Sequence, residues 1–194
     1  MKNIETERYL LRKPKMEDAE DIYEKWGKDK EKIGEYKEHY IHKNTIETKA
    51  LLKSAIKEAE FGTPTWFIED KKTKAIIGYI KVPVFSEKDK KCEVVFYFLK
   101  GWREDHTPEE VLKEVIRNLF TEEPFEIVIT QFYDSSKEDT EFIGLILDRI
   151  GMKREGIHRN RMINSKGQKI DRHVYSILKE EWENYWQINI LEIK

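Results

Sequence analysis

The stretch from Cys92 to Glu123, CEVVFYFLKGWREDHTPEEVLKEVIRNLFTEE, decides how the rest of the chain is interpreted. Its first part, Val94–Leu99, is an almost unbroken run of β-branched and aromatic residues, which is typical of a strand covered on both faces. A short polar turn follows, and the remaining residues have a helical pattern. The stretch therefore predicts a central strand that leads through a tight turn into an amphipathic helix.

The predicted helix has a well-marked start. We expect Thr107 to be the N-cap, Pro108 to occupy the first helical position, and Glu110 to complete a capping box three residues after the cap. Apolar residues then recur on one helix face, at Val111, Leu112, Val115, Ile116, Leu119 and Phe120. Free backbone N–H groups and the positive end of the helix dipole converge at such a start, so the pattern predicts an anion site there.

Composition predicts a single domain over residues 1–194. Of these residues 38% are charged and 12% are aromatic, so a polar surface can enclose an adequate core. The formal net charge of −2 argues against nucleic acid as an obligate partner. A single cysteine, Cys92, excludes an internal disulfide and favours a reducing, cytoplasmic location. We expect no membrane segment, because the sequence has no long apolar span and no apolar signal core.

The other segments predict strands and helices in a recognisable order. Expected strands are 6–13, 66–69, 75–84, 92–99, 125–133, 157–163 and 169–178, and expected helices begin near residues 15, 45, 107, 139 and 179. Pro83 indicates that the third strand ends at or near a sheet edge. Hairpin-paired strands at both ends enclose a βαβα core. This order predicts an α/β (α+β) fold in which helices cover both faces of a mixed sheet.

Four segments, in this order, carry a family resemblance: ETERYLLRKPKMEDAEDIY, CEVVFYFLKGW, ILDRIGMKREG and GQKIDRHVYSILKEEW. Together they resemble the GCN5-related N-acetyltransferase (GNAT) superfamily, and within it the RimJ/RimL-like branch that acetylates ribosomal-protein N-termini. The resemblance implies the GNAT fold, with a mostly antiparallel sheet whose fourth and fifth strands, here 92–99 and 125–133, splay apart. It also implies an N-acetyltransferase with acetyl-coenzyme A as donor and a primary amine as acceptor.

The resemblance also implies contacts to coenzyme A. In the family the pantetheine lies between the two splayed strands and bonds to strand amides, here those of Tyr97, Phe98 and Leu99. An Asn and, three residues later, a Ser usually contact the cofactor from a later helix. Counting along this sequence places Thr140 and Ile143 there, and only Thr140 keeps a hydroxyl.

The loop that would hold the pyrophosphate departs from the family pattern Gln/Arg-x-x-Gly-x-Gly/Ala. Arg103 and Asp105 replace its two glycines, which let the backbone approach phosphate closely. An inward carboxylate at 104–105, about 6 Å from a phosphate charge, would cost roughly 3 kcal/mol at an effective dielectric of about 20. The groups that could still bind phosphate are Lys100, Arg103, His106 and Thr107. The alternative is a charged surface turn that only caps the helix.

Two side chains are candidates for proton transfer. Glu93 opens the central strand and is the first candidate for the base that takes the ammonium proton; the alternative is a solvated carboxylate at a strand end. Tyr133 ends the strand 125–133 and could protonate the leaving thiolate; the alternative is an aromatic ring packed on the sheet. Cys92 is expected to be a buried, inert thiol, because direct transfer needs no acyl-enzyme.

The segment 27–44 is the expected wall of the acceptor site. Its glutamates and aromatic rings could hold a cationic amine through carboxylates and cation–π contacts, and a mobile charged loop is the alternative. His39 and His42 have metal-like spacing, but nothing completes a ligand set, so we expect a solvated loop and no metal. The aromatic residues near the end, Trp182, Tyr185 and Trp186, are expected to pack in the core, with a dimer contact as the alternative.

The leading hypothesis is therefore an N-acetyltransferase, monomeric or homodimeric, that acts on a peptide N-terminus or a small-molecule amine. One alternative is a catalytically inactive GNAT-fold protein that serves as a binding or interaction domain. Another is acetylation of an aminoglycoside or polyamine, which would require a markedly acidic acceptor site.

Overall fold

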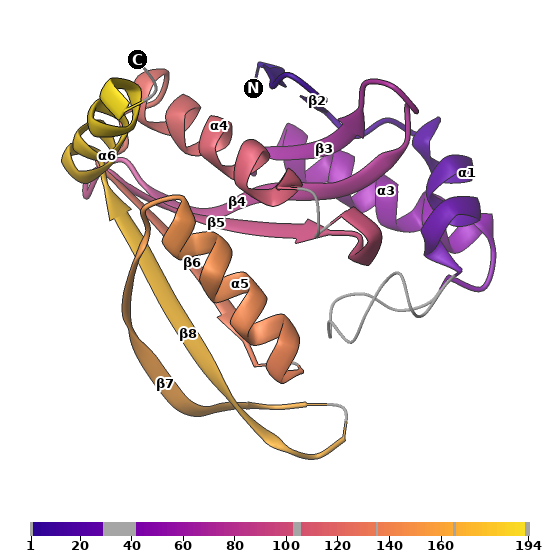
Figure 1. Ribbon diagram of the computed structural model, residues 1–194. Helices are drawn as coiled ribbons and strands as arrows, with labels where there is room; N and C mark the ends of the chain where they lie inside the picture. The colour runs from indigo at the N-terminus through magenta and orange to yellow at the C-terminus, as the bar shows by residue number, and fades with distance from the viewer. Residues whose placement is uncertain (1, 29–41, 103–105, 135, 165, 193–194) are drawn as a thin grey trace. The chain divides into compact units, whose positions relative to one another are not determined.

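The structure is a computed structural model and describes residues 2–28, 42–102, 106–134, 136–164 and 166–192 (Figure 1). Its strands are β1 (Ile4–Glu5), β2 (Tyr9–Arg12), β3 (Thr65–Asp70), β4 (Ile76–Ser86), β5 (Lys91–Phe98), β6 (Ile127–Tyr133), β7 (Lys153–Ile163) and β8 (Lys169–Leu178). Its helices are α1 (Asp18–Ile22), α3 (Thr45–Glu60), α4 (Thr107–Thr121), α5 (Lys137–Arg149) and α6 (Lys179–Glu192). A π-helical turn, η1 (Tyr23–Gly27), extends α1, and a 3₁₀ turn, η2 (Lys100–Trp102), follows β5.

The strands form one eight-stranded sheet in the order β1-β2-β3-β4-β5-β6-β8-β7. β5 and β6 are parallel, whereas β1–β2, β2–β3, β3–β4, β6–β8 and β7–β8 are antiparallel. The predicted α/β class with a mixed, mostly antiparallel sheet is confirmed. The inference that the strand containing Pro83 ends at or near a sheet edge was wrong, because β4 lies between β3 and β5 inside the sheet. Pro83 comes just after the last β3–β4 pair, Thr65 with Lys81, so it removes no hydrogen bond of that ladder.

Residue contacts divide the chain into two compact units. The first unit consists of Met1–Pro83 and Val95–Glu114, and the second of Val84–Val94 and Val115–Lys194. The sequence of β5 and that of α4 each continue from one unit into the other. The single domain expected from composition stays a prediction.

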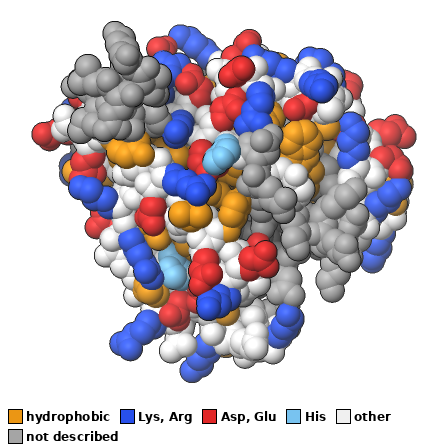
Figure 2. Space-filling view, viewed as in Figure 1, with side chains coloured by type: hydrophobic (Ala, Val, Ile, Leu, Met, Phe, Trp, Pro, Cys, Tyr) orange, Lys and Arg blue, Asp and Glu red, His pale blue; other side chains and the backbone are white. Residues whose placement is uncertain are grey.

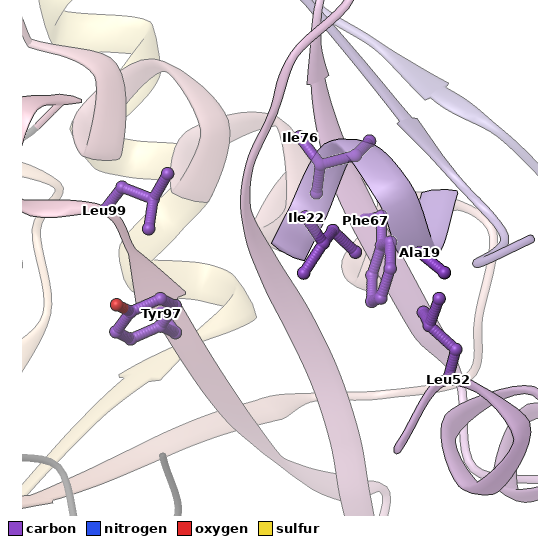
Figure 3. Packing of buried hydrophobic residues seen from close by; sticks show 7 residues of the cluster. All are labelled: Ala19, Ile22, Leu52, Phe67, Ile76, Tyr97 and Leu99. Carbon is purple, nitrogen blue, oxygen red and sulfur yellow. The ribbon is translucent and has the colours of Figure 1, made fainter. Parts of the chain in front are cut away.

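In the first unit, α1 and α3 pack on one face of the sheet. Their buried apolar side chains form a cluster with strand residues (Figure 3), and its members are Ala19, Ile22, Leu52, Phe67, Ile76, Tyr97 and Leu99. Arg12 fixes α1 to the strands, since its guanidinium lies 2.6 Å from a carboxylate oxygen of Asp18 and 2.6 Å from one of Glu69. Arg12 pairs with Phe67, a member of this cluster, so the Arg12 side chain lies on the sheet face that α1 and α3 cover. Tyr9 is three residues before Arg12, and its side chain therefore lies on the other face of the sheet.

The start of α3 differs from the prediction by one residue. Asn44, not Thr45, is the N-cap, and its Oδ1 accepts a hydrogen bond of 3.0 Å from the Glu47 backbone N–H. The Glu47 carboxylate accepts from the backbone N–H of Lys43 at 2.7 Å. Asparagine is among the best N-cap residues, so the local chemistry accounts for this start.

In the second unit, α5, α6 and the long β7–β8 hairpin follow β6 along the chain (Figure 1). Ser136 caps α5, and Gly151 follows it in the left-handed region with φ of 86°, as expected for a helix end. The predicted strand 157–163 begins earlier, at Lys153, and the last helix extends beyond 186 to Glu192. Trp182 packs on Phe120 at a centroid distance of 5.8 Å, in agreement with core packing. The side chain of Trp186 lies outside the described residues.

Two further expectations concern the surface and the core. All six apolar residues predicted on one face of α4 are buried. Acidic and basic side chains are interspersed over the face shown in Figure 2, which agrees with a net charge of −2. Among the described residues, no helix is both long and apolar enough to cross a membrane.

Candidate active site

The residues predicted for the site fall in both units. Those at the end of β5 and the start of α4, from Tyr97 to Thr107, belong to the first unit. Glu93, Tyr133 and Thr140 belong to the second. Arg103 and the side chain of Lys100 lie outside the described residues, so their predicted phosphate contacts stay predictions.

The end of β5 is closely joined to β4. The backbone N–H of Leu99 donates to the carbonyl of Ile77 at 2.9 Å. Gly78 lies against the carbonyl of Tyr97, because a Cβ built at Gly78 would be 2.1 Å from that oxygen. The prediction that the Leu99 amide bonds to pantetheine conflicts with its hydrogen bond to Ile77. The predicted roles of the Tyr97 and Phe98 amides stay predictions.

The predicted capping box at α4 was wrong. The residue before the helix is His106, whose carbonyl accepts from the Glu110 N–H at 3.1 Å. The Thr107 hydroxyl is buried and forms a 2.8 Å hydrogen bond with the Tyr9 hydroxyl, and burial raises the pKa of Tyr9. This bond occupies the hydroxyl that was expected to cap the helix or contact phosphate.

The Glu110 carboxylate is directed to a distant partner. It accepts from the backbone N–H of Arg8 at 3.0 Å and from the Arg8 Nε at 2.6 Å. Burial alone would raise the pKa of Glu110, but hydrogen bonds from Thr6 and Arg8 outweigh burial and lower it. α4 is thus fixed to the start of β2 by the two side chains that were expected to form a capping box.

The charges around the start of α4 are partly balanced. Glu109 is buried in the first turn, 3.5 Å from His106 Nδ1, and its charge partly offsets the burial that lowers the pKa of Lys113. His106 itself is exposed and has φ of 50°. Since Arg8 pairs with Glu110, the first-turn acids compete less with a bound anion than their charges alone suggest.

In the second unit, Glu93 is held by a side chain that the sequence analysis did not identify. The β5–β6 pairing places Glu93 opposite Ile129, so Gln131, two residues further along β6, lies on the same face. Gln131 Nε2 donates to Glu93 Oε2 at 3.0 Å. Glu93 is half-buried. Strand alternation places Gln131 on the same face of β6 as Tyr133, but its contact with Glu93 depends on the register of β5 against β6.

Tyr133 and Thr140 occupy the positions expected from the sequence. Tyr133 is the last residue of β6, is half-buried and pairs with Arg172 of β8. Thr140 lies in the first turn of α5, where its backbone N–H donates to the Ser136 carbonyl at 3.0 Å. Ile143, three residues later, is buried. The catalytic role of Tyr133 and the coenzyme A contact of Thr140 stay predictions.

Two residues weighed in the sequence analysis have structural roles. Cys92 is buried, and burial raises the pKa of its thiol to about 12, so the thiol is protonated at neutral pH. His42 is buried rather than solvated; its Nδ1 lies 2.8 Å from the Thr48 hydroxyl, and burial lowers its pKa. The described residues contain no cluster suited to a metal ion. His39 and most of the predicted acceptor wall, residues 29–41, lie outside the described residues.

The sequence profile described as the acetyltransferase (GNAT) domain matches residues 8–147. The chain belongs to this GNAT acetyltransferase family. The predicted fold and the predicted acyltransferase class are confirmed at the level of the family. No curated protein matches the sequence significantly.

Solved structures show the same fold. A GNAT-family acetyltransferase from Bacillus anthracis has a TM-score of 0.75 at 18% identity, over 92% of this chain and 99% of the other. The ribosomal-protein-S5-alanine acetyltransferase from Vibrio fischeri has a TM-score of 0.75 at 14% identity, over 94% and 99%. The microcin C7 self-immunity acetyltransferase MccE, described in complex with acetyl-CoA and AMP, has a TM-score of 0.72 at 14% identity, over 89% and 93%. At these identities the likeness establishes the fold alone.

Proposed function

We propose that this GNAT protein transfers the acetyl group of acetyl-coenzyme A to the N-terminal amine of a peptide, as a RimJ/RimL-like enzyme with a degenerate phosphate loop. The observation that carries the proposal is the half-buried Glu93 carboxylate, held by Gln131 at the end of the parallel β5–β6 pairing. A base needs a fixed carboxylate within reach of the proton that it takes. The acetyltransferase of ribosomal protein S5 among the structural neighbours supports a peptide acceptor.

In this mechanism the neutral amine attacks the thioester carbonyl carbon. A new C–N bond forms, the C–S bond breaks and the coenzyme A thiolate leaves. Glu93 takes one proton from the ammonium nitrogen, and Tyr133 gives one proton to the departing sulfur. Exchange with solvent returns both side chains to their starting protonation states, so the products are an amide and free coenzyme A.

The chain's own residues fit part of the coenzyme A site. The proposed pyrophosphate contacts in the first turn of α4 are the backbone N–H groups of Thr107 and Glu109, because Pro108 has no N–H and that of Glu110 donates to the His106 carbonyl. Arg8 neutralises the Glu110 carboxylate there. His106, exposed beside the helix start, is a second proposed contact. The Leu99 amide and the Thr107 hydroxyl are already paired within the protein, so the proposal does not assign them to the cofactor.

The first test is isothermal titration with acetyl-coenzyme A, followed by acetyl transfer to a panel of peptides. We expect a micromolar Kd, and for Glu93→Gln a fall in kcat of roughly 10²-fold or more with Kd unchanged. Glu87→Gln, in the exposed turn before β5, is the matched control and is expected to keep the wild-type kcat. No binding at millimolar ligand would falsify the transferase proposal, and full activity in Glu93→Gln would remove Glu93 as the base.

A second candidate function is non-catalytic binding, favoured by Arg103 and Asp105 in place of the two loop glycines. On this alternative the protein binds a peptide or amine without using coenzyme A. The double substitution Arg103→Gly/Asp105→Gly separates the two functions. A gain in coenzyme A affinity over the wild-type protein would indicate an intact site with a weakened loop, whereas no gain and no wild-type binding would favour the binding domain.

A further inference from the structure

The β7–β8 hairpin carries a charge unlike that of the rest of the chain. Residues 153–172 contain seven Lys or Arg and two Asp or Glu, a net charge of +5 in a chain whose total is −2. β7 is the last strand of the sheet, and most of its residues are exposed. The second unit therefore presents a strongly basic sheet edge.

A bulge interrupts this edge at one point. His158 pairs with Arg172 and Met162 pairs with Ile170, so residues 159–161 face the single residue Asp171. Asn160 is in the left-handed region with φ of 52°, which asparagine tolerates better than most residues. Its backbone N–H donates to Asp171 Oδ1 at 2.7 Å. The conformation of the bulge is thus stabilised by a specific hydrogen bond.

The bulge is also joined to the end of β6. The Asp171 carbonyl accepts from the backbone N–H of Asp134 at 3.0 Å, and Asp134 directly follows Tyr133. Tyr133 of β6, Arg172 of β8 and His158 of β7 lie side by side across the three strands. The bulge begins one residue after His158. Two strand spacings separate β6 from β7, roughly 10 Å. The bulge therefore lies within a short peptide's length of the proposed catalytic tyrosine.

Several cations of the hairpin have side-chain partners, whereas two at the bulge have none among the described residues. The Lys153 side chain forms an ion pair with Glu181, and the side chains of Arg154 and Arg172 form hydrogen bonds with those of His173 and His158, respectively. Arg159 and Arg161, on either side of Asn160, are exposed, and no described residue forms an ion pair or side-chain hydrogen bond with either. Guanidinium groups favour carboxylate and phosphate, which they can bind through two hydrogen bonds.

We propose that Arg159 and Arg161 bind an anionic group on the acceptor peptide and so select peptides with an acidic residue near the third position. This inference rests on the proposed transferase function. In the proposed function the reacting amine lies near Tyr133. An extended chain advances about 3.3–3.6 Å per residue, so roughly 10 Å from Tyr133 spans about three residues of such a peptide. The shared chemistry is an anion, either the carboxylate of Asp or Glu or the phosphate of a phosphorylated serine.

Arginine on an edge strand has a competing explanation. Charged side chains and bulges at sheet edges prevent edge-to-edge association of protein molecules. That role requires only charge and twist, and it predicts no preference among acceptors. The two explanations therefore differ in acceptor kinetics and in self-association.

The experiment uses peptides identical except for Asp, Asn, Lys or phosphoserine at the third position, with the full-length protein. For the wild type we expect kcat/KM to be about tenfold higher for Asp than for Asn, which corresponds to about 1.4 kcal/mol. In Arg159→Gln/Arg161→Gln this ratio should fall to about one, with the Asn peptide nearly unaffected. Lys49→Gln/Lys53→Gln, which removes two exposed charges from α3, is the matched control and should keep the preference. The phosphoserine peptide shows which anion is preferred.

A binding assay makes the result independent of turnover. Fluorescence anisotropy of the labelled Asp peptide should show weaker binding to the Arg159→Gln/Arg161→Gln protein, and 0.5 M salt should remove the difference. Arginine-dependent binding without acetyl transfer would support the anion site and contradict the proposed function. Acetyl transfer with an unchanged Asp preference in the arginine variant would overturn the inference. So would aggregation of the variant with unaltered kinetics, or a tighter arginine-dependent complex with a single-stranded oligonucleotide than with the Asp peptide.

Discussion

Two helices of the first unit begin with the same spacing of side chains and use them differently. α3 begins with Asn44 and Glu47, and α4 with Thr107 and Glu110. At α3 the side chains bond to neighbouring backbone N–H groups. At α4 they bond to Tyr9 and Arg8, about a hundred residues away in the sequence. The comparison shows that a capping pattern predicts a cap only where no tertiary partner competes for the same groups.

The largest expected difference between the two helix starts is at their glutamates. Glu110→Ala should lower the free energy of unfolding by about 2 kcal/mol, because it removes the carboxylate that accepts from both the Arg8 Nε and the Arg8 backbone N–H. Glu47→Ala removes an exposed contact and should cost roughly 0.5 kcal/mol. Urea denaturation of both variants measures the difference. Equal costs would show that Glu110 acts as an ordinary cap.

The next effect concerns the hydroxyl pair in the interior. Thr107→Val should cost about 1.5 kcal/mol, because the buried Tyr9 hydroxyl would lose its partner. The double variant Thr107→Val/Tyr9→Phe should cost less than the sum of the two single variants, since no polar group is then left unpaired. Chemical denaturation of all four proteins gives the coupling. Additive costs would mean that the 2.8 Å hydrogen bond contributes little.

At α3 the contribution of the capping residue to stability can be measured separately from that of the residue after it. Asn44→Ala should cost about 1 kcal/mol, whereas Thr45→Ala, at the position expected from the sequence to be the cap, should cost clearly less. Thermal unfolding is sufficient to rank them. A larger loss for Thr45→Ala would contradict the assignment of the cap.

The smallest effect is a pH dependence specific to α4. The pKa of Glu110 is lowered in the folded protein, so its stabilising effect is present above the unfolded pKa, about 4.3, and is lost as the pH falls through the folded value. The stability difference between wild type and Glu110→Gln should therefore shrink between pH 5 and pH 3. Denaturation at several pH values tests this, with Glu47→Gln as the control. A constant difference would mean that ionisation of Glu110 is not linked to folding.

Most of the fold could be predicted because apolar periodicity is local. The runs at 92–99 and 107–121 specified the central strand and helix, and Gly151 marked a helix end. Features that depend on distant residues could not be predicted. Examples are the pair of Arg8 with Glu110 and the hydrogen bond that occupies the Leu99 amide.

For the candidate site, the sequence predicted the positions of side chains on their elements but not their partners. Glu93 and Tyr133 were proposed as candidates from their places at strand ends, and their catalytic roles stay predictions. The hydrogen bond from Gln131 required the register of β5 against β6. The bulge at Asn160 has no turn sequence around it that would have indicated an extra pair of residues. The bulge arises because β7 has two more residues than β8 between neighbouring pairs, and the sequence of one strand alone does not specify this difference.

The buried Cys92 can report local unfolding of the protein. It is the single cysteine of the chain, and its thiol is both shielded and protonated in the native state. An aromatic disulfide reagent can react with it only after the structure around it has opened. The rate of colour release would then count opening events of the second unit directly, without an added label. The same measurement in the presence of acetyl-coenzyme A would show whether a bound donor slows that opening.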